Sequence, residues 1–298
     1  MKADRLQGLD ALRGIAALMV VGHHAGVGGH YYLAVDFFFV LSGFVMARTY
    51  EGRFPSPHDF VLRRWRRFFP MMVLGTAFGF AAGLHITSWD LVGLLAVCAL
   101  LQLPLPGESP FPLNPPAWSI TAELFANLVH AIALRRLSVP ALLCVSLAAL
   151  TGMFMLGAGL DKYPLSGTLR VLISYPLGIV LWRINGDAPR ALTWLWSAGL
   201  LVAAPAILAV LPRGADFLFP FVAVLIMLGG LTHAPVPRLF TFLGAISFPL
   251  YAFHAPVLYL STAKLGSPIP GVVFSLALAS LLVMAPALAV KRQQAVSA

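Results

Sequence analysis

The residues best suited to chemistry interrupt an apolar stretch near the beginning of the chain. The run from residue 9 to 24 holds Arg13 near one end and His24 at the other. On a helix the two would lie about 16 Å apart along the axis, roughly half of a bilayer. A cation and an imidazole at that depth cost free energy, so we interpret them as serving chemistry.

Two carboxylates and a second histidine fall in other apolar stretches. Asp36 comes near the outer end of the second stretch, Glu123 about two turns into the fourth, and His254 in the outer third of the ninth. If the stretches cross in alternating directions, all three reach the level of His24 and could form an acid/base site. The alternative is that such groups only hydrogen-bond neighbouring helices, which we expect for three further histidines: His23, His85 and His130.

Composition identifies the elements that must position these groups. Of 298 residues, 59% are hydrophobic and 10% are charged, and the mean hydropathy of +0.87 is too high for a water-soluble domain. The chain is therefore expected to be a polytopic protein in a lipid bilayer. Its net charge of +9 fits the basic cytoplasmic loops of such proteins, so no nucleic-acid partner is expected.

The apolar stretches predict an all-α fold, a membrane helix bundle of about ten transmembrane spans forming one domain over residues 1–298. The expected spans are 11–27, 33–49, 68–86, 117–134, 139–159, 168–184, 191–211, 216–231, 238–260 and 270–290. A further stretch, 89–103, is short. We expect the proline-rich region 87–116 around it to form a re-entrant or capping segment.

The distribution of Lys and Arg predicts the topology. By the positive-inside rule, we expect that residues 89–103 do not cross the membrane and that both termini are cytoplasmic. We expect this membrane to be the inner membrane of a bacterium. A basic cluster then faces the cytoplasm: Arg48, Arg63, Arg64, Arg66 and Arg67. The outer loops hold only Lys162, Arg170, Arg213 and Lys264. Because Arg13 interrupts the first run and no small-residue cleavage site follows, we expect that run to be a retained span.

No metal or disulfide framework is expected. Cys98 and Cys144 lie in apolar runs without a CxxC pattern or a nearby histidine pair. Neither an HxxxH motif nor a pair of carboxylates at one-turn spacing is present.

Five motifs together resemble the acyltransferase-3 family of integral-membrane O-acyltransferases. They are LDALRGIAALMVVGHH from Leu9 to His24, VDFFFVLSGFVMAR from Val35 to Arg48, RRWRRFFP from Arg63 to Pro70, WSITAE from Trp118 to Glu123, and SFPLYAFHAP from Ser247 to Pro256. Each is weak alone, but five in the family's order make a strong resemblance. The chain departs from many relatives in lacking a closing Glu-x-Pro element in its last span.

The resemblance implies an acyl-CoA donor, most simply acetyl-CoA, that binds from the cytoplasm, and an acceptor hydroxyl of a carbohydrate or small molecule on the outer side. His24 is the implied catalytic residue. A basic inner mouth would suit the CoA phosphates, and its expected members are Arg13, Arg48, Arg63, Arg64 and Arg67. The expected acceptor-binding residues are Trp118, Ser119 and His254.

Two mechanisms remain open for such an enzyme, an acyltransferase of groups other than aminoacyl groups. His24 could remove the acceptor's proton as a general base, or take the acyl group itself and pass it on. In both, a carboxylate at Glu123 or Asp36 would fix the imidazole tautomer. The alternative function is a proton-coupled transporter that uses the same buried groups as a relay. The absence of repeated halves and paired broken spans argues against it.

Overall fold

A computed structural model describes residues 6–82, 111, 113–157, 165–189, 193–212, 214–232 and 234–296 of the chain. Beyond residue 285 it describes only the course of the backbone. These ranges contain helices and loops and no strand, which confirms the all-α prediction for this part of the chain. Almost all of the expected capping segment 87–116, and the whole stretch 89–103, lie outside the described residues.

Each expected span corresponds to one helix in the described ranges. The α-helices are α1 (Gln7–His24), α2 (Ala34–Tyr50), α3 (Pro57–Ala81), α5 (Ala117–Ile132), α6 (Val139–Met155), α7 (Leu165–Asn185), α8 (Trp194–Ala209), α9 (Phe219–Gly230), α10 (Arg238–Leu265) and α11 (Ile269–Val296). Short 3-10 helices are η1 (Tyr31–Leu33), η2 (Leu134–Arg136) and η3 (Ala215–Leu218).

Three of the described segments are long and apolar enough to cross a bilayer, namely Tyr31–Tyr50, Ser166–Asn185 and Arg238–Leu265. Shorter apolar helices accompany them, and large apolar side chains such as Leu147, Phe154 and Leu195 are exposed on the outside of the bundle. An apolar exterior of this kind indicates an integral membrane protein. The number of crossings and the side on which each terminus lies remain predictions.

Helix α3 begins eleven residues before the expected start at residue 68, so the arginine cluster is helical. Ser56 caps the helix, since its side chain accepts a hydrogen bond of 3.1 Å from the Asp59 amide, and Pro57 opens the first turn. A search for long apolar stretches misses the start of α3, because this part of the helix holds several charged residues.

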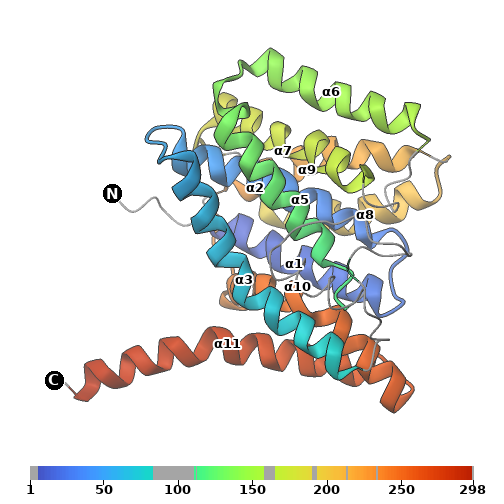
Figure 1. Cartoon of the computed structure of the whole chain (residues 1–298), viewed down its shortest axis with the longest axis vertical. Coiled ribbons are helices and arrows are strands. Elements are labelled where there is room, and N and C mark those ends of the chain that lie inside the picture. The colour runs from blue at the N-terminus through green and yellow to red at the C-terminus, as the bar shows by residue number, and fades with distance from the viewer. Residues whose placement is uncertain are drawn as a thin grey trace.

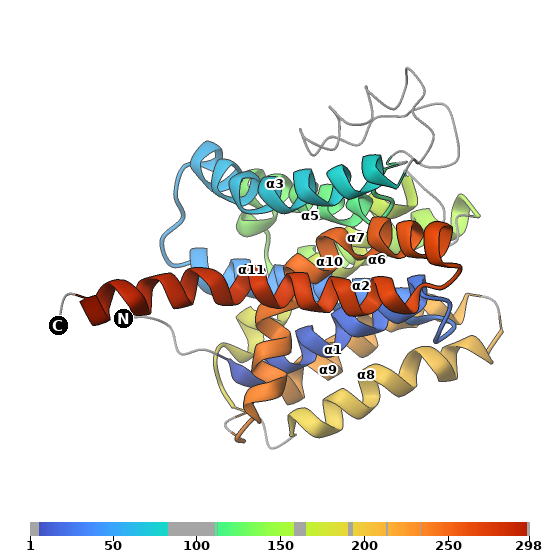
Figure 2. The ribbon, with the colours of Figure 1, turned by 90° about the horizontal axis from the view of Figure 1, so that it is seen from below.

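The bundle is built from pairs of helices that pack along their lengths. Helix α1 packs on α10, α2 on α7, and α8 on α9, while α3 contacts both α10 and α5. In Figure 1, α6 lies at one edge over α7 and α11 at the opposite edge. Figure 2 shows α11 continuing past the other helices toward the C-terminus.

A proline on α10 creates a tertiary hydrogen bond. Pro256 has no N–H to give to the carbonyl of Ala252, four residues earlier. The side chain of Asn114, which lies just before α5, donates to that carbonyl at 2.9 Å. The carbonyl that Pro256 leaves without its usual helical donor thereby fixes the segment that leads into α5.

The contact between α1 and α10 depends on Gly14. A Cβ at this position would lie 2.6 Å from Cβ of Leu243 and 2.8 Å from the amide nitrogen of Gly244, closer than Cβ atoms in proteins approach other heavy atoms. The two backbones can meet only because Gly14 has no side chain.

We expect Gly14→Ala to destabilise the protein by about 1–3 kcal/mol, because α1 must move away from α10. Thermal unfolding of the purified protein in detergent, followed by size-exclusion chromatography, measures the effect. Gly199→Ala on α8 is the matched control, since nothing lies within 4 Å of a Cβ there. Equal stability of the two variants would contradict the close approach of α1 and α10.

Candidate active site

A cavity of about 610 Å³ lies between α1, α2, α3, α5 and α10. Its lining residues on α2 extend from Val35 to Arg48, and the thirteen helical steps between them span about 20 Å. The cavity is therefore elongated along α2.

One end of the cavity is cationic. Four of the five arginines predicted to bind the donor line it, and they are Arg13, Arg48, Arg64 and Arg67. Only two carboxylates, Asp10 and Glu123, lie among the lining residues, so the charge of the lining is positive. Arg63 is exposed and does not line the cavity. Arg64 and Arg67 share one face of α3 because they are three residues apart.

These arginines are held in place by specific contacts. Arg13 donates to the carbonyl of Gly244 through Nε at 3.1 Å and Nη2 at 2.5 Å, and its Nη2 lies 3.3 Å from Asp10. Nη2 of Arg64 lies 2.9 Å from Oε1 of Glu123. At the rim, Nε of Arg48 lies 2.6 Å from Asp187.

Glu123 is placed differently from the expectation that it shares the depth of Asp36. Its Oε1 also accepts a hydrogen bond of 2.6 Å from Ser42, which lies six residues, or about 9 Å, beyond Asp36 along α2. Glu123 thus faces the cationic part of the cavity and pairs with Arg64. Its catalytic role remains a prediction.

Two hydroxyl groups lie in the wall farther along the cavity. Oγ of Ser119, one of the predicted substrate-binding residues, lies 2.6 Å from the hydroxyl of Tyr251, and both residues line the cavity and are buried. The ring of Phe38 packs edge-on against Tyr251, with centroids 5.8 Å apart. Tyr251 was not predicted, because a tyrosine in an apolar stretch looks like a core residue.

His24 and His254 contact each other directly. Nδ1 of His254 lies 2.9 Å from the carbonyl oxygen of Tyr251, which can only accept, so this nitrogen carries the proton. In the neutral ring Nε2 is then an acceptor, and it lies 3.1 Å from Nδ1 of His24. That nitrogen must donate, and it also lies 2.9 Å from the carbonyl oxygen of Val20.

The hydrogen bonds therefore assign the tautomer of His24. With the proton on Nδ1, the lone pair of the neutral ring lies on Nε2, and no described residue hydrogen-bonds that atom. The partner that orients His24 is an imidazole, where the sequence predicted a carboxylate. Neither histidine is among the lining residues, and His254 follows Tyr251 by one turn of α10.

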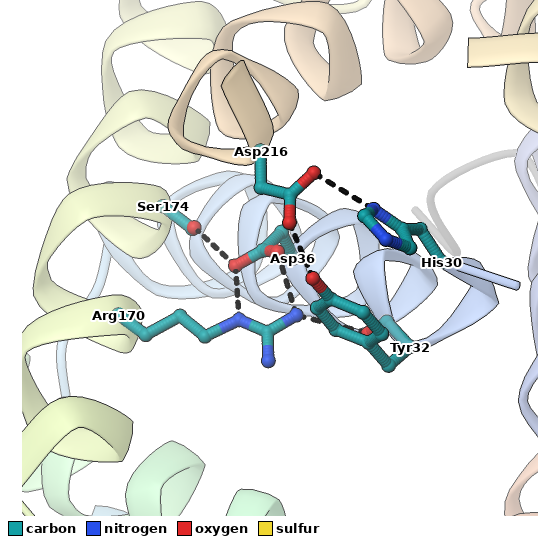
Figure 3. A network of polar contacts seen from close by, with 6 residues as sticks. All are labelled: His30, Tyr32, Asp36, Arg170, Ser174 and Asp216. Carbon is teal, nitrogen blue, oxygen red and sulfur yellow. Dashed lines mark hydrogen bonds and ion pairs between the residues drawn. The ribbon is translucent and has the colours of Figure 1, made fainter. Parts of the chain in front are cut away.

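Asp36 forms a buried ion pair with Arg170 of α7 (Figure 3). Its carboxylate accepts from Nε and Nη2 of Arg170 at 2.9 and 2.7 Å, and Oγ of Ser174 lies 3.2 Å away. The expectation that Arg170 lies in an outer loop is therefore wrong. Because Asp36 needs a buried cation and Arg170 lies inside an expected span, their pairing could have been proposed from the sequence.

The same network reaches the partly exposed end of the bundle. Arg170 donates to the carbonyl of Tyr32 at 2.9 Å, and the Tyr32 hydroxyl donates to Asp216. Asp216 also lies 3.0 Å from Nδ1 of His30 (Figure 3). Trp118, predicted to bind substrate, is buried with its ring 5.5 Å from the Arg170 guanidinium and does not line the cavity.

Comparison with known proteins adds independent information. A family model described as an acyltransferase domain matches residues 6–290. Protein 2 in the picA locus of Rhizobium radiobacter is 36% identical over 41% of this chain and 79% of its own length. BcsY of Komagataeibacter xylinus, whose name describes a membrane-bound transacylase, is 27% identical over 94% of this chain and 80% of its own. No solved structure matches the chain.

We expect Asp36→Asn to lower the stability of the protein by about 3–5 kcal/mol, because it removes the negative charge that pairs with the buried guanidinium of Arg170. Thermal unfolding in detergent measures the loss. Asp187→Asn is the control, since it breaks a pair whose aspartate is half exposed and should cost at most about 1 kcal/mol. Unchanged stability with lost turnover would instead support the catalytic role predicted for Asp36.

Proposed function

We propose a reaction for this chain, which belongs to the acyltransferase-3 family of membrane acyltransferases. It transfers an acyl group, most simply acetyl, from acyl-CoA to a hydroxyl of an envelope sugar or a secreted small molecule. The observation that carries the proposal is the elongated cavity, which is cationic at one end and has Tyr251 in its wall farther along. The ring centroid of Tyr251 lies 5.7 Å from that of His254, which contacts His24.

The cationic end supports binding of the CoA phosphates. Guanidinium groups suit phosphate because they donate two parallel hydrogen bonds and stay charged. Arg64 is buried, and its Nε–H has no acceptor within the described ranges, so it retains the capacity to donate. Arg67 lines the cavity and is exposed, and in the described part of the chain no carboxylate lies within ion-pair distance of it.

The length and lining of the cavity support an extended donor. Phe38, Phe39 and Ile120 give it apolar walls on the way to Ser119 and Tyr251. The pantetheine arm is long and thin, so a donor held by its phosphates at the arginines can extend its thioester toward the histidines.

The assigned tautomer of His24 supports base catalysis. The Nε2 lone pair can take the proton of an acceptor hydroxyl as the oxygen attacks the thioester carbon. The resulting imidazolium keeps its Nδ1–H on two acceptors, the Val20 carbonyl and Nε2 of His254. The same lone pair would also start the alternative in which His24 carries the acyl group.

We expect His24→Ala to lower acyl transfer at least 100-fold, because the base is lost. The assay supplies radiolabelled acetyl-CoA to membrane vesicles that contain the protein and follows label on hydroxyl products by chromatography. His58→Ala is the control, since this histidine is exposed in the first turn of α3. Solute flux that needs no acyl-CoA, with no labelled product, would favour the transporter.

We expect Arg67→Ala to raise the KM for acetyl-CoA about tenfold and to leave the KM for S-acetylpantetheine, which lacks the nucleotide phosphates, unchanged. Arg63→Ala is the matched control because this arginine is exposed off the cavity. Equal effects of Arg67→Ala on both donors would contradict a phosphate contact.

A further inference from the structure

The hydroxyl groups of the cavity differ in whether their hydrogens are available. Ser42 donates to Glu123 at 2.6 Å, and Ser247 donates to the carbonyl of Gly244 at 2.8 Å, so both hydrogens are engaged. Ser119 and Tyr251 share a hydrogen bond of 2.6 Å in which either oxygen can be the donor. This pair is therefore the place in the described lining where a hydroxyl hydrogen can be redirected.

Two arrangements of the pair fit the observed distances. In the first, Ser119 donates to the Pro116 carbonyl at 2.9 Å and Tyr251 donates to Ser119. In the second, Ser119 donates to Tyr251, and the phenol hydrogen is free to point elsewhere. Rotation about two C–O bonds interconverts them.

The exchange loses no hydrogen bond once an acceptor stands in the cavity beside Tyr251. The phenol then donates to that acceptor, and the serine hydroxyl donates to the phenol oxygen in place of Pro116. The Pro116 carbonyl keeps the backbone amide of Ser119, 3.2 Å away. The serine hydrogen bond also polarises the phenol and strengthens its donation.

The geometry points to Tyr251 as a catalytic residue that donates to the carbonyl oxygen of the acyl thioester, with Ser119 as its positioning residue. This inference rests on the proposed function. As the acceptor oxygen bonds to the carbonyl carbon, the π electrons move to the carbonyl oxygen, and the phenol hydrogen bond stabilises the negative charge. The C=O bond then re-forms, the C–S bond breaks, and the proton held by His24 passes to the CoA thiolate.

The test measures acetyl-CoA turnover by Tyr251→Phe, which keeps the ring and removes only the hydroxyl. We expect kcat to fall about 100-fold with the KM for acetyl-CoA unchanged, because the donor acts on charge that develops during the reaction. Tyr175→Phe is the matched control. This tyrosine is buried too, its hydroxyl donates to Asn127 at 3.2 Å, and it does not line the cavity. Its kcat should stay near wild type.

Ser119→Ala provides a second measurement. If Ser119 acts through Tyr251, it should lower kcat severalfold in the wild-type background and have no effect when position 251 is Phe. Full activity of Tyr251→Phe, or independent effects of the two substitutions, would overturn the inference. Both outcomes are measured against a wild type that turns over acetyl-CoA, whereas a wild type that does not would refute the proposed function itself.

Discussion

The hydrogen bond between His24 and His254 is the contact on which the rest of the site depends. A buried ring nitrogen that carries a proton needs an acceptor, and the carbonyl of Tyr251 supplies one to His254. From that single assignment the proton positions of both rings follow, and the lone pair of His24 falls on Nε2. In this arrangement no carboxylate is needed to fix the tautomer of His24.

The buried carboxylates instead join helices. Asp36 ties α2 to α7 through Arg170, and Glu123 ties α5 to α3 through Arg64. An ion pair in an apolar interior gains little net stability but is costly to break, so it specifies which helices are neighbours. Helices α2 and α3, which carry Arg48, Arg64 and Arg67, are thereby placed by charge, whereas α1 and α10 are placed by close backbone packing.

The sequence predicted the positions of the helices well and the side-chain contacts between them poorly. Long apolar runs located every described helix, but α3 starts earlier because its first turns are capped and charged. Four of the five predicted arginines and Ser119 do line one cavity. Spacing along a chain cannot show which side chains meet across helices, so only the matching of two buried opposite charges could have linked Asp36 to Arg170. Tyr251 was missed because its hydroxyl has meaning only beside Ser119.

The contact at Gly14 has a mechanical consequence. The two histidines belong to the helices whose backbones touch there, α1 and α10, so this contact fixes the helices that carry them relative to each other. Arg64, Arg67 and Ser119 come from α3 and α5, which form the other side of the cavity. A change in the distance of α3 and α5 from these two helices would therefore leave the contact between the imidazoles in place, and it would break the hydrogen bonds that Asn114 and Ser119 make to α10.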